Sequence, residues 1–181
     1  MKAMKLPKLP ALGAPAGGGF FAGVYLQGNT LRKLFVASEE GELVEQVYHS
    51  SLNRIKGALS LEDGLVNTRA MAKAGSVLAQ KMLELRFGGY KDWCLGARDQ
   101  AYTAWKNLKF NAAGAALLKK KGGGAFADDV YWTSTQYAAY DGCAWVQGFG
   151  LGDQLNWRKD LRLRGRAVRR YLIQQFNAST I

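Results

Sequence analysis

The sequence predicts a single domain of the α+β class, in which strands and helices occupy separate parts of the chain. Strand-like patterns come first, two helical patterns follow, and a cluster of short strand-like runs ends the chain. A length of 181 residues suits one domain with at most a short appendage. The chain has 22 glycines but only three prolines, so we expect its folded part to bend through glycine turns.

Residues 1–19 are predicted to form an N-terminal arm. The segment is rich in Lys, Pro, Ala and Gly, ends in three consecutive glycines, and has too few large apolar side chains to fold alone. We therefore expect an assembly element that anchors the chain to a partner and that can be deleted up to Ala16 without unfolding the rest. The domain is predicted over residues 20–173, followed by a C-terminal tail over residues 174–181.

The first strands are predicted from two apolar runs, 20–26 and 31–37, which flank a Gln-Gly-Asn-Thr turn typical of a hairpin. A polar break follows, and then a short strand at 43–48. The final four strands are predicted at 130–135, 144–149, 154–159 and 161–169. In the last run, small and apolar residues alternate with arginines, which places the two kinds on opposite faces.

Two helices are predicted between these groups of strands. Apolar residues recur at helical spacing over residues 68–85, with Asn67 as the N-cap and Gly75 as a weak point that can divide the helix. A second helix is expected over residues 98–108. Residues 112–121 fit either a short helix or an insertion.

The net charge of +11 raises the question of an acidic partner. The charge is concentrated near the two ends, at Lys2, Lys5, Lys8, Arg162, Arg164, Arg166, Arg169 and Arg170. Because no nucleic-acid-binding motif accompanies these residues, we favour a role in solubility and in contact with an acidic partner surface over specific nucleic-acid binding.

Membrane insertion and secretion are not predicted. No apolar run approaches the ~20 residues that a membrane span needs, and the first ten residues lack the apolar stretch of a signal peptide. A chain made in the cytoplasm is expected to keep Cys94 and Cys143 reduced, although a bridge formed after release is the alternative.

Several segments, taken in order, resemble a known family. The first is Gly88-Gly89-Tyr90-Lys91-Asp92-Trp93-Cys94-Leu95, which leads into the second helix. The others are Tyr131-Trp132-Thr133-Ser134-Thr135 and the closing Arg164-Gly165-Arg166-Ala167-Val168-Arg169. Together they resemble the C-terminal domain family of collagen-like bacterial adhesins, which is common as a lone domain in phage genomes. Asp63–Thr68 resembles the lead-in to that family's first helix, and the resemblance covers residues 20–171.

The resemblance implies a C-type-lectin-like fold, in which two helices pack on short antiparallel sheets and the final strand pairs beside the first. Trp93 and Trp132 then fill the core, and Asp92 caps or braces a loop. The chain departs from the family pattern at Cys94, where the family has Arg, and at Leu95-Gly96, where it has Leu-Pro. These departures affect local geometry more than the fold.

Catalysis and metal binding are not predicted, and neither is a cofactor. His49, Cys94 and Cys143 are too scattered in sequence to indicate a zinc site or an activated thiolate. Calcium is disfavoured because Asn156-Trp157-Arg158-Lys159-Asp160 offers few carboxylates and two cations. Formylglycine-generating enzymes share the broad fold and are the best enzymatic alternative, but no catalytic cysteine motif is present.

A binding surface is therefore the predicted functional feature. The stretch from residue 136 to residue 160 is rich in Tyr, Trp, Asn and Arg, which are typical of recognition surfaces. The fold that the resemblance implies is similar to that of the phage receptor-binding proteins diversified by retroelements, and in those proteins this late region presents the ligand face. We expect Trp145 to point inward. The predicted ligand-binding residues are Tyr137, Tyr140, Asp141, Gln154, Asn156, Trp157 and Arg158.

The resemblance and this surface together predict a phage virion protein without enzymatic activity. The favoured function is a tail or tail-tip adhesin module that binds a host surface receptor, either a glycan or a protein. The alternative is a structural virion component, such as a capsid decoration or connector module. Other virion proteins are the expected partners of the arm, and a homo-oligomer is the expected assembly.

Overall fold

The computed structural model describes residues 8–120 and 123–176. Its strands are β1 (Pro15–Ala16), β2 (Gly19–Gln27), β3 (Thr30–Val36), β4 (Glu42–Val47), β5 (Cys94–Leu95), β6 (Val130–Gln136), β7 (Cys143–Gly148), β8 (Gln154–Arg158) and β9 (Arg162–Gln175). Its helices are α1 (Gly64–Lys73), α2 (Val77–Glu84), α3 (Arg98–Trp105) and α4 (Ala112–Lys120), with a 3₁₀ turn at Glu39–Gly41 and a π-helical turn at Lys106–Phe110. The α+β class is confirmed.

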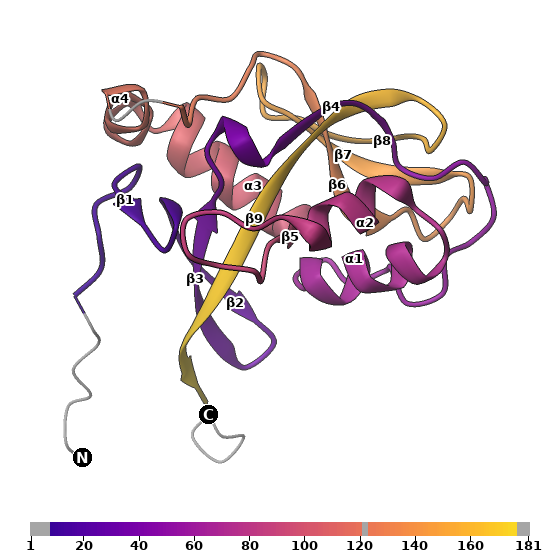
Figure 1. The fold of residues 1–181 in the computed structure, drawn as a ribbon, viewed down its shortest axis with the longest axis horizontal. Coiled ribbons are helices and arrows are strands. Elements are labelled where there is room, and N and C mark those ends of the chain that lie inside the picture. The colour runs from indigo at the N-terminus through magenta and orange to yellow at the C-terminus, as the bar shows by residue number, and fades with distance from the viewer. Residues whose placement is uncertain (1–7, 121–122, 177–181) are drawn as a thin grey trace.

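The long strand β9 organises the sheet. The strands follow the order β1-β2-β3-β9-β6-β7-β8, and β4 and β5 also pair with β9. In Figure 1, β9 crosses the whole molecule between the β2–β3 hairpin and the β6–β8 strands. The expectation that the final strand pairs beside the first is wrong, because β9 lies against β3, while the free edge of β2 is taken by β1.

Two apolar cores lie on opposite faces of β9. Ala167 belongs to the core beneath α1 and α2, together with Trp93 and Trp132, as expected for those two rings. Its neighbour Val168 belongs to the second core, which β2, β3, α3 and α4 share. The alternation of residues along a strand thus sends successive side chains of β9 into different cores.

The arginine face of β9 is mostly internal. Arg166 is buried, donates to the Glu42 carboxylate and to the carbonyls of Ala37, Gly124 and Ala125, and places its guanidinium over the Phe126 ring. Arg164 binds Glu42 and Asp129. These arginines are therefore occupied within the domain, which removes them from the cationic surface that the sequence predicts.

Arg169 links two of the segments that carry the family resemblance, Gly88–Leu95 and Arg164–Arg169. Its guanidinium makes two hydrogen bonds to Asp92, at 2.9 and 3.1 Å, and stacks 3.6 Å from the centre of the Tyr90 ring. A third hydrogen bond reaches the Gly17 carbonyl. Asp92 thus braces the loop before β5, as the resemblance implies, because a bidentate pair fixes both orientation and distance.

The helices begin and end differently from the prediction. Asp63, not Asn67, caps α1, because its carboxylate accepts from the backbone N–H groups of Leu65 and Val66. Asn67 is fully buried and holds the Ser60 backbone. The predicted helix over 68–85 is divided at Gly75, which has φ of 98° and separates α1 from α2.

The second predicted helix ends in a π-helical turn, and the ambiguous run 112–121 contains the helix α4. The last predicted strand is longer than expected, since β9 continues to Gln175 and takes in the start of the expected tail. Residues 177–181 of that tail lie outside the described residues. Among the residues that the structure describes, no helix is long and apolar enough to cross a membrane.

The predicted boundary at residue 20 is wrong for the described part of the arm. Gly13 is buried against α4, and its N–H donates to the Phe21 carbonyl, while the Phe21 N–H donates to the Ala14 carbonyl. Pro15 and Phe20 are paired residues of β1 and β2. The chain thus joins the domain well before residue 20, and residues 1–7 lie outside the described residues.

Candidate recognition face

The turn between β6 and β7 brings two tyrosines together. The Tyr137 N–H donates to the Cys143 carbonyl, and the Cys143 N–H donates to the Tyr140 carbonyl, which closes the turn. The two ring centres lie 6.0 Å apart with the planes inclined by 30°. Tyr137 is half-buried, whereas Tyr140 is 67% exposed. The predicted pairing of these residues on an accessible surface is therefore present.

Trp145 and Arg98 extend this pair. The Trp145 ring meets Tyr137 edge to face at 5.3 Å, and the Arg98 guanidinium lies 4.7 Å from the centre of the Trp145 ring. The expectation that Trp145 points inward is wrong. Trp145 lies on the opposite face of β7 from Ala144 and Val146, which are both buried in the first core. Arg98 carried no sequence signal of this position, since it comes from the start of α3.

The β7–β8 register separates two of the predicted residues. Trp145 lies opposite Asn156, and Ala144 lies opposite Trp157. Paired residues share a face of the sheet, so Asn156 lies with Trp145 and Trp157 lies on the other side. Trp157 packs there against the first core. The prediction that Trp157 joins Tyr137 and Tyr140 on one exposed face is therefore wrong, and Asn156 does lie on that face.

The remaining predicted residues border the aromatic rings. Half-buried Gln154 donates from Nε2 to the Arg98 carbonyl at 2.9 Å, which ties β8 to the start of α3. Exposed Asp141 pairs with Arg54 at 2.6 Å, and exposed Arg158 pairs with Asp160 at 2.6 Å. We use "recognition face" for Tyr137, Tyr140, Trp145, Asn156 and Arg98 together with these bordering residues.

A buried lysine supports the recognition face from below. Lys159 is fully buried and donates from Nζ to the Gln136 Oε1 at 2.6 Å and to the Asn53 carbonyl at 2.9 Å. The Gln136 side chain also accepts from the Ile55 N–H. The loop before α1 is thus fixed against the end of β6, next to Tyr137. Burial lowers the pKa of Lys159 from 10.5 to about 8.

The candidate catalytic and metal-binding residues are used structurally or lie apart. His49 accepts from the Ser51 N–H at Nδ1 and donates from Nε2 to the Ala74 carbonyl at 2.8 Å. Both cysteines are free; Cys94 is buried in the second core, where burial raises the pKa of its thiol to about 12. Among the described residues, no three His, Cys, Asp or Glu side chains come together as a metal site would require.

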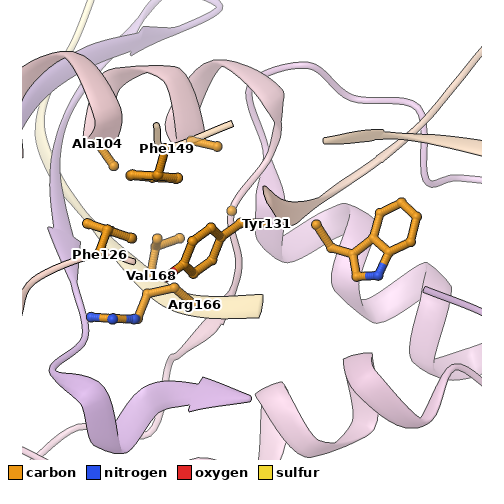
Figure 2. A pocket seen from close by; sticks show the side chains of 9 residues that line it. Ala104, Phe126, Tyr131, Phe149, Arg166 and Val168 are labelled. Atoms are coloured by element: carbon orange, nitrogen blue, oxygen red, sulfur yellow. The ribbon is translucent and has the colours of Figure 1, made fainter. Parts of the chain in front are cut away.

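A small cavity lies in the second core, away from the recognition face. Figure 2 shows Phe126, Tyr131 and Phe149 around it, with Arg166 beneath. The Phe126 and Phe149 rings stack 3.9 Å apart. The free volume of about 20 Å³ holds little more than one water molecule. The cavity is therefore a packing feature of the core and is too small for an organic ligand.

Comparison with models of known protein families gives no match, and a search of curated proteins gives none either. The resemblance to the C-terminal domains of collagen-like adhesins and the C-type-lectin-like fold that it implies therefore stay predictions.

Proposed function

We propose that the chain is a binding module that recognises a ligand through the recognition face. The observation that carries this proposal is the contiguous group of rings Tyr140–Tyr137–Trp145, in which the two tyrosines stack and Trp145 meets Tyr137 edge to face. The group is exposed at its Tyr140 end, and the Arg98 guanidinium lies over the Trp145 ring at its other end. An exposed aromatic ring presents apolar surface to water, so covering the ring with a ligand is favourable. Rings that neighbouring rings already hold in place lose little conformational entropy when the ligand binds. An arrangement of this kind favours recognition over catalysis.

The support beneath the face favours the same conclusion. The Arg54 guanidinium binds both the Ala138 carbonyl and Asp141, so it fixes the two ends of the turn that carries Tyr140. Lys159 and Gln136 fix the base of that turn. A binding surface built on rigid elements keeps its geometry in the absence of ligand, which reduces the entropy cost of association.

The biological setting in the proposal comes from the family resemblance. We propose a phage virion protein, specifically a tail or tail-tip adhesin that attaches the particle to a host surface receptor. Its anchor to other virion proteins is proposed in the N-terminal arm, and its assembled form is proposed to be a homo-oligomer.

The adhesin proposal is tested with virions that carry Tyr140→Ala. The exposed ring contributes little to folding, so the variant is expected to assemble normally. Adsorption to host cells is expected to fall at least about tenfold, as it does when a central aromatic anchor is lost. Tyr171→Ala is the matched control, because Tyr171 is 58% exposed on β9 and lies away from the recognition face. Normal adsorption of the Tyr140→Ala virions would refute the adhesin proposal.

A structural role in the virion is the second candidate function, and a different surface favours it. Tyr102, Trp105 and Phe110 form a row of rings with centres 5.7 and 5.3 Å apart, and Phe110 is 74% exposed. Gly152 lies against the Trp105 ring, and the residue before it, Leu151, is 90% exposed. Exposed apolar groups in one place are typical of subunit contacts. Loss of particle assembly in Phe110→Ser with normal folding would favour this role.

A further inference from the structure

We infer that the recognition face binds an uncharged saccharide. This inference rests on the proposed binding function and names the chemical class of its ligand. It depends on three properties of the face: its charge balance, its size, and the kinds of polar group that surround its rings.

The first property is the balance of charge at the face. Three arginines border the rings, and each has an aspartate partner: Arg54 with Asp141 at 2.6 Å, Arg158 with Asp160 at 2.6 Å, and Arg98 with Asp99 at 3.4 Å. The charges exposed on the face are therefore balanced in a protein whose net charge is +11, and the cation beneath it, Lys159, is buried out of reach of a ligand.

Local neutrality argues against an anionic ligand. An acidic group that approaches any of these arginines also approaches its aspartate, and the two charges act on it with opposite sign. The Arg98 guanidinium is further restricted, because one of its faces lies over the Trp145 ring. We therefore expect anions to bind to other parts of the surface of this basic protein.

The second property is size. Tyr140, 67% exposed, is the most exposed large apolar side chain of the face, and Leu52, 40% exposed, lies beside Gly142 of the same turn. A stable protein–protein interface needs roughly 800 Å² from each partner and a closed apolar centre. Two or three rings suit a small ligand better. The other strongly exposed apolar side chains, Phe110 and Leu151, belong to the surface around α3.

The third property is the chemistry of the polar groups. The exposed Asn156 carboxamide lies on the same face as Trp145, and it makes no hydrogen bond to the part of the chain that the structure describes. A carboxamide offers both donors and acceptors without charge, as do tyrosine hydroxyls. A sugar ring presents C–H groups on one side and hydroxyls around its edge. An aromatic ring beside neutral donors and acceptors therefore complements it on both counts.

The test uses the purified full chain on an array of immobilised oligosaccharides. The array carries neutral hexose, deoxyhexose and N-acetylhexosamine chains, and also uronic-acid, sialylated and sulfated chains. Each bound saccharide is then titrated by calorimetry at about 50 and 500 mM salt. A neutral ligand is expected to keep its affinity within about twofold, since screening acts only on charges.

The variants locate the bound saccharide on the protein. Tyr140→Ala is expected to weaken binding at least about tenfold and Asn156→Ala about five- to tenfold, while Tyr171→Ala is expected to bind like the natural chain. Binding that is confined to acidic saccharides and weakens steeply with salt would overturn the inference. So would neutral binding that is unchanged in Tyr140→Ala.

The absence of any saccharide ligand would also overturn the inference, and the virion experiment then separates it from the proposed function. If Tyr140→Ala virions lose adsorption although no saccharide binds, the receptor is a protein and the adhesin function stands. If adsorption is also normal in those virions, the binding function itself is refuted.

Discussion

Lys159 is a fully buried cation, and no carboxylate among the described residues lies within ion-pair distance of it. The Lys159 ammonium donates hydrogen bonds to an amide oxygen and a backbone carbonyl, and it lies 5.7 Å from the centre of the Tyr48 ring. The arginines Arg166 and Arg169, by contrast, each have a carboxylate partner. Dipoles and a ring compensate a buried charge less completely than an opposite charge does, which is why the Lys159 pKa falls.

The lowered pKa of Lys159 predicts a pH dependence of stability with a defined sign. In the unfolded chain the amine titrates at its ordinary pKa, so between pH 8 and 10.5 the unfolded state holds more protons than the folded state. Stability therefore rises with pH across this window, by roughly 3 kcal/mol from this group. Below pH 8 the whole cost of burying the charge is present.

The measurement compares the natural chain with Lys159→Met, which has similar volume and no amine. The unfolding free energy of both proteins is measured with denaturant at about pH 7.5 and pH 10.5. Titration of the groups that the two proteins share cancels when one unfolding free energy is subtracted from the other at each pH. The difference in unfolding free energy is expected to shift in favour of the natural chain at the higher pH. A difference that does not change with pH would show that the amine is solvated in the folded protein.

At the scale of elements, the hairpin of β7 and β8 shows how alternation decides which residues can bind. Gln154, Asn156 and Arg158 lie on one face of β8, and Leu155 and Trp157 lie on the other. Sequence reasoning selected residues by type and so placed Trp157 with the binding residues. The polar and apolar alternation of β8 carried the correct assignment, since Gln154, Asn156 and Arg158 alternate with Leu155 and Trp157. The run Cys143–Val146 of β7 is apolar at every position and carried no such signal.

Asn156 and Trp157 form a matched pair for testing this assignment, because they are neighbours on one strand with opposite surroundings. Asn156→Ala is expected to change the free energy of unfolding by no more than about 0.5 kcal/mol. Trp157→Ala is expected to cost about 2–3 kcal/mol, since it removes a large ring that is half-buried against the first core. Chemical denaturation of both variants measures these values. Equal, small effects would show that Trp157 is not part of the core.

Local sequence patterns predicted most helices and strands, but they could not predict ion pairs between residues that are far apart in the sequence. The hairpin at residues 20–37, the division at Gly75 and the alternation of β9 depend on neighbours in sequence, and each was predictable. Arg166 pairs with Glu42, which is 124 positions away, and Arg169 pairs with Asp92, which is 77 positions away. Nothing in the local pattern of β9 distinguishes these buried arginines from exposed ones. The same limit explains why Arg98 was absent from the predicted site.

For the molecule as a whole, the start of the chain completes the second core. Figure 1 shows the segment that contains β1 lying between α4 and the β2–β3 hairpin. A Cβ at Gly13 would collide with the Gly114 carbonyl of α4, and the φ of 77° at Gly13 is one that glycine adopts readily. Gly17 lies against the Phe35 ring, and its carbonyl accepts from Arg169. Residues 13–19 therefore behave as part of the domain.

Two truncations test how far the domain extends. Deletion of residues 1–7 is expected to leave the free energy of unfolding within about 0.5 kcal/mol of the full chain, because it keeps all the residues described for the two cores. Deletion of residues 1–16 removes β1, the backbone hydrogen bonds of Gly13 and Ala14 to Phe21, and the cover over Leu118 and Phe21, which are 1% and 2% exposed. We expect the deletion of residues 1–16 to lower the free energy of unfolding by at least about 2 kcal/mol, since it exposes buried apolar surface and leaves backbone groups unpaired.

Thermal and denaturant unfolding of both truncated chains measure the two values. If the longer deletion is as stable as the shorter one, the arm is separate from the domain and the packing of residues 13–16 contributes nothing to it.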